Sequence, residues 1–498
     1  MIIATGNEVD LTSLDMMEHL LEDDGVEIVV CYMEGIREGR RLRKIGQRAL
    51  EVGKPIVIWK VGNTEKGSRA ALSHTANLTS SYAMYKAVFD EGGFIEIADT
   101  YDLVDVVRAF QRRRLPAGNR VGIMTTSGGA GVLLTDRCEE QGLSVPELSV
   151  ATAQTLRELG GGFAAVENPV DLSAKLAGDP VAFNDATRIL LDDPNIDMTI
   201  IRSFAGTASD VWATGLATLL ETQTKPVLVT LSGLASHSAA AVATMEAHGI
   251  PWYPTPGRTV RGAAALALFA HKARLHRETL HPSADTNLPG ADLPAGKQVL
   301  SERDSKTVLQ QYGIPVVGEI AVKEEGVDTL ETLPFGFPVV VKIDSPDIPH
   351  KTEAGGVRVG LTTIDAVRTA AHDVIESARR YASEARIHGV LVQQTASGTE
   401  LIVGGVNDPI FGPYVMIGLG GIFSEVMKDT AMRYAPFDEA VVREMLSSLK
   451  GRKLFEGYRG MPAYDLGQLA HVVSKVSQLM VNQGDRIAEL DINPLFVR

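Results

Sequence analysis

Short β-branched runs alternate with amphipathic helical segments through the first half of the chain, and this alternation most constrains the fold. Strand-like runs occupy residues 26–32, 55–60 and 121–125, and residues 37–52 carry helical spacing with Arg and Lys outward. Strands that alternate with helices favour βαβ units on a parallel sheet, so we predict an α/β fold. The run 26–32 is apolar on both faces, and we expect it to lie inside its sheet rather than at an edge.

Two polar, Pro-containing segments divide the chain. Because 498 residues exceed one hydrophobic core, about three domains are expected. The basic run 111–114, followed by Pro116, predicts a connection to a second α/β unit, and the Pro-rich stretch 277–296 predicts a linker to an α+β part. The further expected elements are strands at 198–202, 226–230 and 252–256, a helix at 259–276, a helix at 301–312, and strands at 338–342, 389–394 and 400–406.

Composition excludes several classes of function. The net charge of −14 argues against broad binding of nucleic acid or anionic membranes, since both need a positive surface. No segment approaches ~20 uninterrupted apolar residues, and the N-terminus has no basic or apolar leader, so we expect a cytoplasmic enzyme with no membrane contact. We expect the two cysteines, Cys31 and Cys138, to pack in the interior as free thiols.

Two histidines lie in settings suited to carrying phosphate. His74 is flanked by Ser73 and Thr75 among small residues, and His350 precedes Lys351 in a Gly-containing segment. A neutral imidazole is a good nucleophile near pH 7 and can accept a phosphoryl group. Glu34 follows a strand, where its carboxylate can orient an imidazole. Two such histidines predict a phosphoryl relay, although a histidine in a Ser/Thr loop can also have no chemical role.

Other patterns are typical of phosphate and metal binding. Ser127, Gly128, Gly129 and Gly131 stand between a strand and a helix, where backbone N–H groups can cradle an anion or form a plain tight turn. Gly420 and Gly421 offer a second such turn. Lys342 ends an apolar strand and either reaches ATP phosphates or is a surface lysine. Three alternating residues share one face of a strand and suit Mg²⁺, or simply a solvated strand edge: Glu489, Asp491 and Asn493.

Nine motifs in fixed order span nearly the whole chain. They are Gly6-Asn7-Glu8, Tyr32-Met33-Glu34-Gly35-Ile36, Ser73-His74-Thr75, Ser127-Gly128-Gly129-Ala130-Gly131, Asn168-Pro169-Val170-Asp171, Pro346-Asp347-Ile348-Pro349-His350-Lys351, Gly420-Gly421-Ile422-Phe423, Asp429-Thr430-Ala431-Met432-Arg433-Tyr434-Ala435-Pro436 and Glu489-Leu490-Asp491-Ile492-Asn493-Pro494-Leu495. With these motifs the chain resembles the nucleoside-diphosphate-forming acyl-CoA synthetases, of the acetate–CoA ligase (ADP-forming) type related to succinyl-CoA synthetase. The resemblance implies two flavodoxin-like succinyl-CoA-ligase domains, 1–116 with His74 and 117–280, a linker at 281–296, and an ATP-grasp domain at 297–498.

The resemblance also implies a reaction and its residues. A carboxylic acid, ATP and CoA would give acyl-CoA, ADP and phosphate through an acyl phosphate and phosphohistidine, with Mg²⁺ held by Glu489, Asp491 and Asn493. His74 matches the phosphohistidine, Glu34 the acid that steadies it, and His350 a relay histidine. The implied ATP-binding residues are Lys342, Gln393, Gln394, Glu400 and Arg433. The family precedent implies a homo- or hetero-oligomer.

The start of the chain departs from this family. Its members normally begin with a CoA-binding domain, then a strand and a Ser/Gly phosphate loop, whereas Met1 falls just before Gly6. We therefore expect CoA to bind through a missing or separate domain. One alternative is a nucleotide-binding regulatory or partial subunit that needs a partner with the CoA-binding domain. Another is an ATP-grasp ligase that joins a carboxylate to an amine, in which His74 would have no role.

Overall fold

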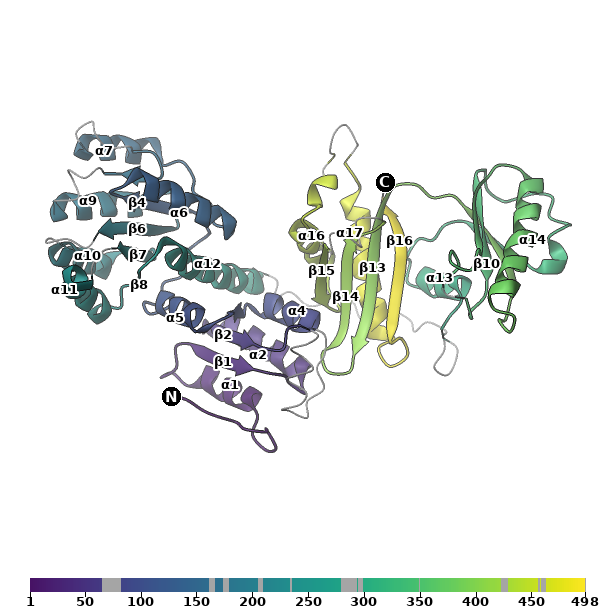
Figure 1. Ribbon diagram of the computed structural model, residues 1–498, viewed down its shortest axis with the longest axis horizontal. Coiled ribbons are helices and arrows are strands. Elements are labelled where there is room, and N and C mark those ends of the chain that lie inside the picture. The colour runs from purple at the N-terminus through teal and green to yellow at the C-terminus, as the bar shows by residue number, and fades with distance from the viewer. Residues whose placement is uncertain are drawn as a thin grey trace. The chain divides into compact units, whose positions relative to one another are not determined.

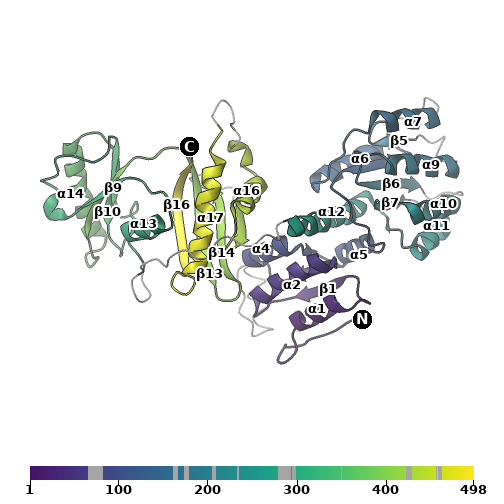
Figure 2. The same cartoon turned by 180° about the vertical axis from the view of Figure 1, so that it is seen from behind.

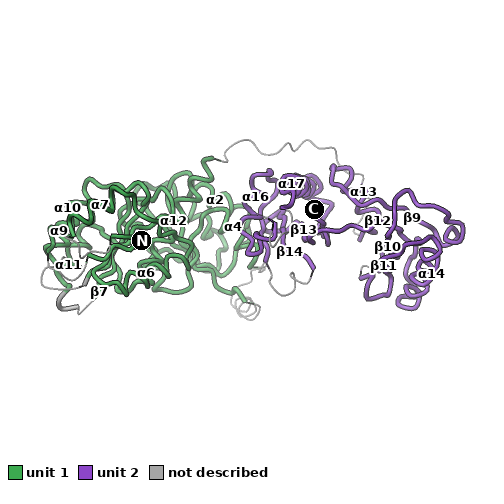
Figure 3. The backbone as a smooth tube through the Cα atoms, turned by 90° about the horizontal axis from the view of Figure 1, so that it is seen from above, with its two compact units in different colours: residues 1–281 green, residues 282–498 purple. Residues whose placement is uncertain are grey.

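The chain forms two compact units, Met1–His281 and Pro282–Arg498, which are coloured separately in Figure 3. The structure is a computed structural model (Figure 1). It describes residues 1–64, 82–160, 166–172, 179–204, 209–232, 235–278, 293, 299–348, 350–421, 429–455, 457 and 463–497. His74 lies outside these residues.

The first sheet of unit Met1–His281 is parallel, with strand order β1-β2-β3. Its strands are β1 (Val29–Met33), β2 (Ile56–Lys60) and β3 (Ile95–Glu96), and the neighbouring helices are α1 (Ser13–Glu22), α2 (Gly39–Val52), α4 (Tyr82–Gly92) and α5 (Thr100–Ala109). Among the described residues β1 is the edge strand of its sheet, so the expectation that residues 26–32 lie inside a sheet is wrong. Val30 and Tyr32 are 46% and 57% exposed, so only alternate residues of β1 are buried. Apolar composition alone does not show whether another strand pairs with each side of β1.

The second sheet of the same unit is also parallel and has the order β5-β4-β6-β7-β8. It contains β4 (Val121–Thr125), β5 (Val170–Asp171), β6 (Met198–Phe204), β7 (Val227–Ser232) and β8 (Trp252–Tyr253), with helices α6 (Gly128–Glu140), α7 (Val150–Gly160), α9 (Pro180–Leu191), α10 (Ser209–Thr222), α11 (Ala235–Ala247) and α12 (Pro256–Glu278). The strands expected near 121, 198, 226 and 252 are confirmed. The α/β architecture of this half of the chain is therefore as predicted.

One hydrophobic core joins the two sheets of this unit. Val57 and Ile95 of the first sheet belong to the same buried cluster as Val121 of the second and Phe269 of α12. The basic connection before β4 is fixed in place. Arg112 donates to the carbonyl oxygens of His248 and Leu220, at 2.8 and 2.9 Å, and Arg114 also donates to Leu220. The connection thus packs against the second sheet's helices.

Unit Pro282–Arg498 contains two antiparallel four-stranded sheets. The first has the order β11-β10-β12-β9 and is packed on one face by α14 (Ile364–Tyr381). Its strands are β9 (Glu319–Val322), β10 (Val339–Asp344), β11 (Val357–Leu361) and β12 (Gly389–Gln394). The second has the order β15-β14-β13-β16, with β13 (Thr399–Asp408), β14 (Gly412–Leu419), β15 (Thr430–Tyr434) and β16 (Glu489–Val497). Helices α16 (Glu439–Ser448) and α17 (Leu466–Asn482) cover one face of the second sheet (Figure 2).

Helix α13 (Glu302–Gln311) contacts both of these sheets. Val308 and Tyr312 on one side of the helix are buried in the core of the β15-β14-β13-β16 sheet. Glu302 and Lys306, four residues apart on the other side, bond to residues of the β11-β10-β12-β9 sheet. Leu293 belongs to the same core as Val308, although it falls inside the predicted linker. The helix is therefore anchored by apolar contacts to one sheet and forms hydrogen bonds and ion pairs with the other.

Both cysteines are buried free thiols, as expected, and burial raises the pKa of each to about 12. Such thiols stay protonated and behave as small apolar side chains. Among the described helices, none combines the length and the apolar composition needed to cross a bilayer.

Candidate functional site

Glu34 stands directly after β1, at the carboxyl edge of the first sheet, and is half-buried. The buried Lys60 ammonium donates to the Glu34 carbonyl oxygen at 2.9 Å and to the carbonyl oxygen of Val61. The same ammonium lies 4.7 Å from the centre of the Tyr85 ring, and burial lowers its pKa. Lys60 thus fixes the backbone at Glu34. Sequence reasoning missed this role, although a lysine that ends an apolar strand was a visible signal.

The N-terminus of α6 is open to solvent at the predicted phosphate loop. Ser127 is the N-cap, yet its side chain makes no capping bond, and Gly128 and Gly129 are exposed. A Cβ at Gly129 would meet nothing within 4 Å, whereas one at Gly131 would lie 3.1 Å from Pro169. Helix N–H groups without an internal partner attract anions. The Asp171 carboxylate lies beside Gly128 and adds negative charge at the same edge.

His350 is exposed on the segment that connects β10 with β11. The segment is held at its start by Asp347, which forms an ion pair with Arg386 at 2.7 Å, and these hydrogen bonds lower the pKa of Asp347 to about 2. It is held at its end by the Gly356 N–H, which donates to the Lys351 carbonyl oxygen at 2.7 Å. An exposed imidazole between two anchored ends is accessible to a phosphoryl donor.

Lys342 lies in a cluster of charged side chains on one face of the first sheet of unit Pro282–Arg498. The Glu302 carboxylate accepts from Lys342 at 3.0 Å, from Lys306 at 2.9 Å and from the Gln393 amide at 2.7 Å. Its second oxygen lies 3.2 Å from the Lys351 ammonium. Although burial alone would raise the pKa of Glu302, the lysines and these hydrogen bonds hold it well below its ordinary value.

This cluster adds residues that were not predicted to the site around Lys342, and it leaves out one that was. Glu319 of β9 bonds to Lys306 at 2.6 Å and to Gln393 at 3.0 Å. Sequence reasoning predicted Lys342 and Gln393 but missed Glu302, Lys306 and Glu319, whose only signal was the i, i+4 spacing of Glu302 and Lys306. Gln394, one residue after Gln393, points to the opposite face of the sheet, beside Gly318. The structure therefore does not bring Gln394 to Lys342.

Glu400 and the second glycine turn lie together in the second sheet of the unit. The Gly420 N–H donates to the Glu400 carbonyl oxygen at 2.8 Å. A Cβ at Gly421, where φ is +60°, would lie 2.8 Å from the Glu400 carboxylate. Glycine suits this close approach and the positive φ, so the turn packs directly against Glu400, whose side chain is exposed.

The three predicted Mg²⁺ ligands share the outer, exposed face of β16. Glu489, Asp491 and Asn493 are exposed, while Leu490 and Ile492 between them face the core. Asp491 pairs with Gly404 of β13, which has no side chain to cover it, and partial desolvation raises the pKa of Asp491.

Residues two apart on a strand are about 7 Å apart, so one ion with ligands at about 2 Å can contact neighbouring members but not all three. Among the described residues no group of three His, Cys, Asp or Glu side chains converges as a metal site. Two oxygen donors with open space beside them fit a Mg²⁺ ion whose other ligands are phosphate and water.

Arg433 does not join these residues. It pairs with Val415, whose side chain faces the core under α16 and α17. Its guanidinium donates to Glu444 of α16 at 3.1 Å. Arg433 therefore lies on the helix-covered face, opposite Asp491 and Glu400, because the strand register decides the face that each residue occupies.

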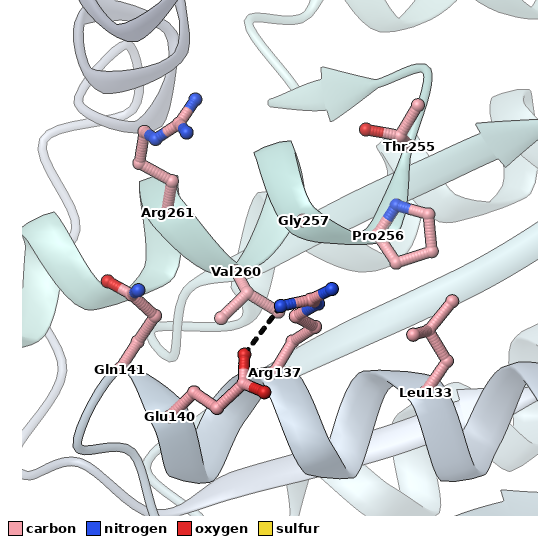
Figure 4. A pocket seen from close by; sticks show the side chains of 9 residues that line it. All are labelled: Leu133, Arg137, Glu140, Gln141, Thr255, Pro256, Gly257, Val260 and Arg261. Atoms are coloured by element: carbon pink, nitrogen blue, oxygen red, sulfur yellow. Dashed lines mark hydrogen bonds and ion pairs between the residues drawn. The ribbon is translucent and has the colours of Figure 1, made fainter. Parts of the chain in front are cut away.

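A cavity of about 410 Å³ lies between α6 and the N-terminus of α12 in the first unit (Figure 4). Its cationic residues, Arg137 and Arg261, are already paired, Arg137 with Glu140 and Arg261 with Asp102 and Asp105. None of the predicted site residues lines it. The cavity is thus separate from the predicted chemistry.

Three family models match the chain in order. A succinyl-CoA ligase like flavodoxin domain matches residues 1–110, a Ligase-CoA domain matches residues 121–277, and an ATP-grasp domain matches residues 292–498. Together they cover most of the chain. The α/β fold with two flavodoxin-like ligase domains before an ATP-grasp domain is confirmed in this order.

Curated relatives match along the whole chain or in two parts. The acetate–CoA ligase [ADP-forming] I of Archaeoglobus fulgidus is 30% identical over 505 residues, which is 100% of this chain and 72% of that protein. In Pyrococcus furiosus the similarity is divided between subunits. The acetate–CoA ligase [ADP-forming] II subunit alpha is 36% identical over 53% of this chain and 58% of its own length. The corresponding enzyme I subunit beta is 37% identical over 41% of this chain and 87% of its own length.

A solved structure gives a similar result for part of the chain. The Ca. Korarchaeum cryptofilum dinucleotide forming acetyl-coenzyme A synthetase 1, in complex with phosphate and ADP, superposes with a TM-score of 0.52 and 27% identity. The match covers 56% of this chain and 61% of that one.

Proposed function

The chain belongs to the family of ADP-forming acyl-CoA ligases, and on that premise we propose that it converts a carboxylic acid, ATP and CoA to acyl-CoA, ADP and phosphate. The nucleotide, Mg²⁺ and CoA are the cofactor and substrates that this family's reaction requires. The identity of the acid stays part of the proposal. So do the domain boundaries at 116, 280 and 296 and a location in the cytoplasm.

The chemistry proceeds through transferred phosphate. A carboxylate resists attack by a thiol because oxide is a poor leaving group, whereas an acyl phosphate releases phosphate. We place the phosphoryl group first on a ring nitrogen of His350, with ADP as the leaving group, then on His74, and then on the acid. The CoA thiolate then attacks the acyl carbon, and phosphate leaves. Each transfer forms one P–N or P–O bond as another breaks.

Residues of the ATP-grasp part would bind the nucleotide. In this proposal Lys342 and Gln393 contact phosphates and nucleotide on the first sheet, and the Glu400–Gly421 turn does so on the second. Asp491 with a neighbouring oxygen donor would hold Mg²⁺, which neutralises phosphate charge when it is bound. In the first unit, the open N-terminus of α6 would hold the arriving phosphoryl group, and Glu34 would steady the imidazole of His74.

One observation carries this proposal above the others: His350 is exposed, and the next residue, Lys351, reaches the same carboxylate as Lys342. A histidine with no chemical role has no need of this proximity to a nucleotide lysine. A ligase that joins a carboxylate to an amine would also leave His350 without a role.

Phosphoryl labelling tests the proposal directly. Incubation with Mg²⁺ and ATP labelled at the γ-phosphate is expected to give acid-labile, base-stable label on the protein, because phosphohistidine has that stability. His350→Ala is expected to lose nearly all label. His372→Ala is the matched control, since His372 is an exposed histidine of α14 in the same part of the chain and is paired with Asp328. Equal labelling of His350→Ala and wild type would exclude His350 as the acceptor.

We further propose that a partner supplies the CoA-binding part. The acetate–CoA ligases of Pyrococcus furiosus are divided into separate alpha and beta subunits, so the reaction of this family can be shared between chains. In this case the isolated chain would become phosphorylated but form acyl-CoA only with the partner added. Acyl-CoA synthesis by the isolated chain, measured by thioester formation, would contradict the requirement for a partner. Nucleotide binding without labelling would instead favour a regulatory subunit.

A further inference from the structure

The Glu302 carboxylate is the common partner of three lysines from three different segments. Lys306 lies one turn later in α13, Lys342 lies in β10, and Lys351 follows His350. Their ammonium groups are 2.9, 3.0 and 3.2 Å from the carboxylate. The four side chains are 16–29% exposed, so water screens these contacts only in part. Glu302 therefore joins the strand that carries Lys342 to the segment that carries His350.

Glu302 lies on a helix that is anchored in the fold. Ser301 caps the helix that carries it, with the Asp304 N–H donating to the Ser301 hydroxyl, and Val308 and Tyr312 bury the other side of the helix. The His350 segment is restrained at its start by Asp347 and at its end by the buried Ala354 and by Gly356, and Lys351 joins its middle to Glu302 of α13. Breaking the Glu302–Lys351 pair would thus remove the side-chain contact that holds the part of the segment beside His350 to α13.

A bound nucleotide would compete for the same lysines. The cluster holds three ammonium groups against two carboxylates, Glu302 and Glu319. Phosphate oxygens carry more charge than one carboxylate and offer more acceptors, so they are stronger partners for Lys342. Their arrival beside Glu302 places like charges together, and this repulsion disfavours the existing carboxylate–lysine arrangement.

We propose that Glu302 is a positioning residue that tethers the His350 segment through Lys351 while no nucleotide is bound, and that nucleotide phosphates release the segment by taking Glu302's lysines. This inference rests on the proposed function, because it assumes that Lys342 contacts nucleotide phosphate. In this role Glu302 does not touch the reacting atoms but controls where the His350 segment lies. The tether would keep His350 in place until a nucleotide is bound.

The test measures nucleotide affinity and segment protection together on the full chain. Glu302→Gln keeps the side-chain shape and removes the charge that competes with phosphate. It is expected to bind ADP about fivefold more tightly by calorimetry. Without nucleotide, the Ala354 and Gly356 amides of this variant are expected to exchange hydrogen faster than in wild type. Saturating ADP is expected to produce the same acceleration in wild type.

Two further variants keep the test decisive. Lys351→Met removes the tether alone, so it is expected to speed exchange at Ala354 and Gly356 even if Glu302→Gln folds poorly. Glu324→Gln is the matched control. It breaks the exposed Glu324–Arg379 ion pair beside the same sheet and should change neither readout.

The possible failures are distinguishable. If wild type binds ADP but Glu302→Gln binds it equally or more weakly, the inference about Glu302 is overturned while the proposed function stands. Unchanged exchange in Lys351→Met without nucleotide also overturns the tether. Absence of ADP binding by wild type would overturn the proposed function and, with it, release by phosphates.

Discussion

At the scale of residues, the carboxylates of the candidate site differ in how firmly the protein holds them. Lysines and hydrogen bonds lower the pKa of Glu302, and Arg386 lowers that of Asp347 to about 2. The pKa of Asp491 is instead raised, because partial desolvation disfavours its charge and no ion pair with a described residue offsets this. Glu302 and Asp347 are therefore satisfied within the protein, whereas Asp491 would gain from a bound cation.

The lowered pKa of Glu302 predicts a pH-dependent contribution to stability. A carboxyl whose folded pKa lies below its unfolded value stabilises the fold above the unfolded pKa, about 4.3, and loses this contribution as pH falls toward the folded pKa. Glu302→Gln does not titrate, so it is expected to cost about 2 kcal/mol at pH 7 and progressively less below about pH 4. Urea unfolding of both proteins at pH 7, 4 and 3 measures the difference. A difference that grows on acidification would contradict the assigned shift.

At the scale of elements, glycines set how closely neighbouring strands and turns approach. Gly389 begins β12 with φ of +126°, and a Cβ placed there would overlap the carbonyl oxygen of Val322 in β9. Gly356 ends the His350 segment, where a Cβ would lie 2.8 Å from Ile343 and 3.0 Å from the Lys351 carbonyl oxygen. The sheet that presents Lys342 and Gln393 therefore depends on positions without side chains.

Gly389→Ala tests this dependence. The substitution forces either β9 to move or an L-residue into a disfavoured backbone region, and it is expected to destabilise the protein by about 3 kcal/mol. Gly336→Ala is the matched control, because a Cβ there meets nothing within 4 Å, and its expected effect is within about 0.5 kcal/mol. Thermal and urea unfolding give both values. Equal stabilities for the two variants would exclude a close approach at Gly389.

At the scale of the whole molecule, the chain has separate cores in its two units. Phe269 belongs to the core that joins both parallel sheets of the first unit, whereas Leu293 packs in a core of the second with Val308 and Tyr312. The carbonyl oxygen of Leu293 also accepts from Arg486. Leu293 thus contributes to the ATP-grasp unit, although the sequence pattern grouped it with a linker.

Separate cores predict separate unfolding transitions for the full chain. Leu293→Ala is expected to destabilise one unit by about 2–3 kcal/mol and to lower only its transition. Phe269→Ala is expected to lower only the other transition, by a cost of about 3–5 kcal/mol. Differential scanning calorimetry of the two variants assigns the transitions. A single transition that both substitutions lower would contradict independent units.

The sequence predicted many residues of the candidate site, but it predicted only in part which of them lie together. Local patterns predicted Lys342, Gly420, Gly421 and the face shared by Glu489 and Asp491, and the family resemblance implied Gln393 and Glu400. The roles of these residues stay predictions. Glu302, Lys306 and Glu319 meet only after residues far apart in sequence pack together. The role proposed for His74 stays a prediction, because His74 lies outside the described residues.

By itself, the sequence determined the alternation of strands and helices, the three-part order of the family and the chemistry-bearing residue types. The alternation follows from short-range backbone preferences and from the period of apolar side chains, whereas the three-part order follows from the resemblance that the nine motifs carry. Only the tertiary structure decided that β1 is an edge strand, that Gln394 points away from Gln393, and that Arg433 faces α16. Strand order and register arise from long-range pairing, and a change of one residue in register moves a side chain to the other face.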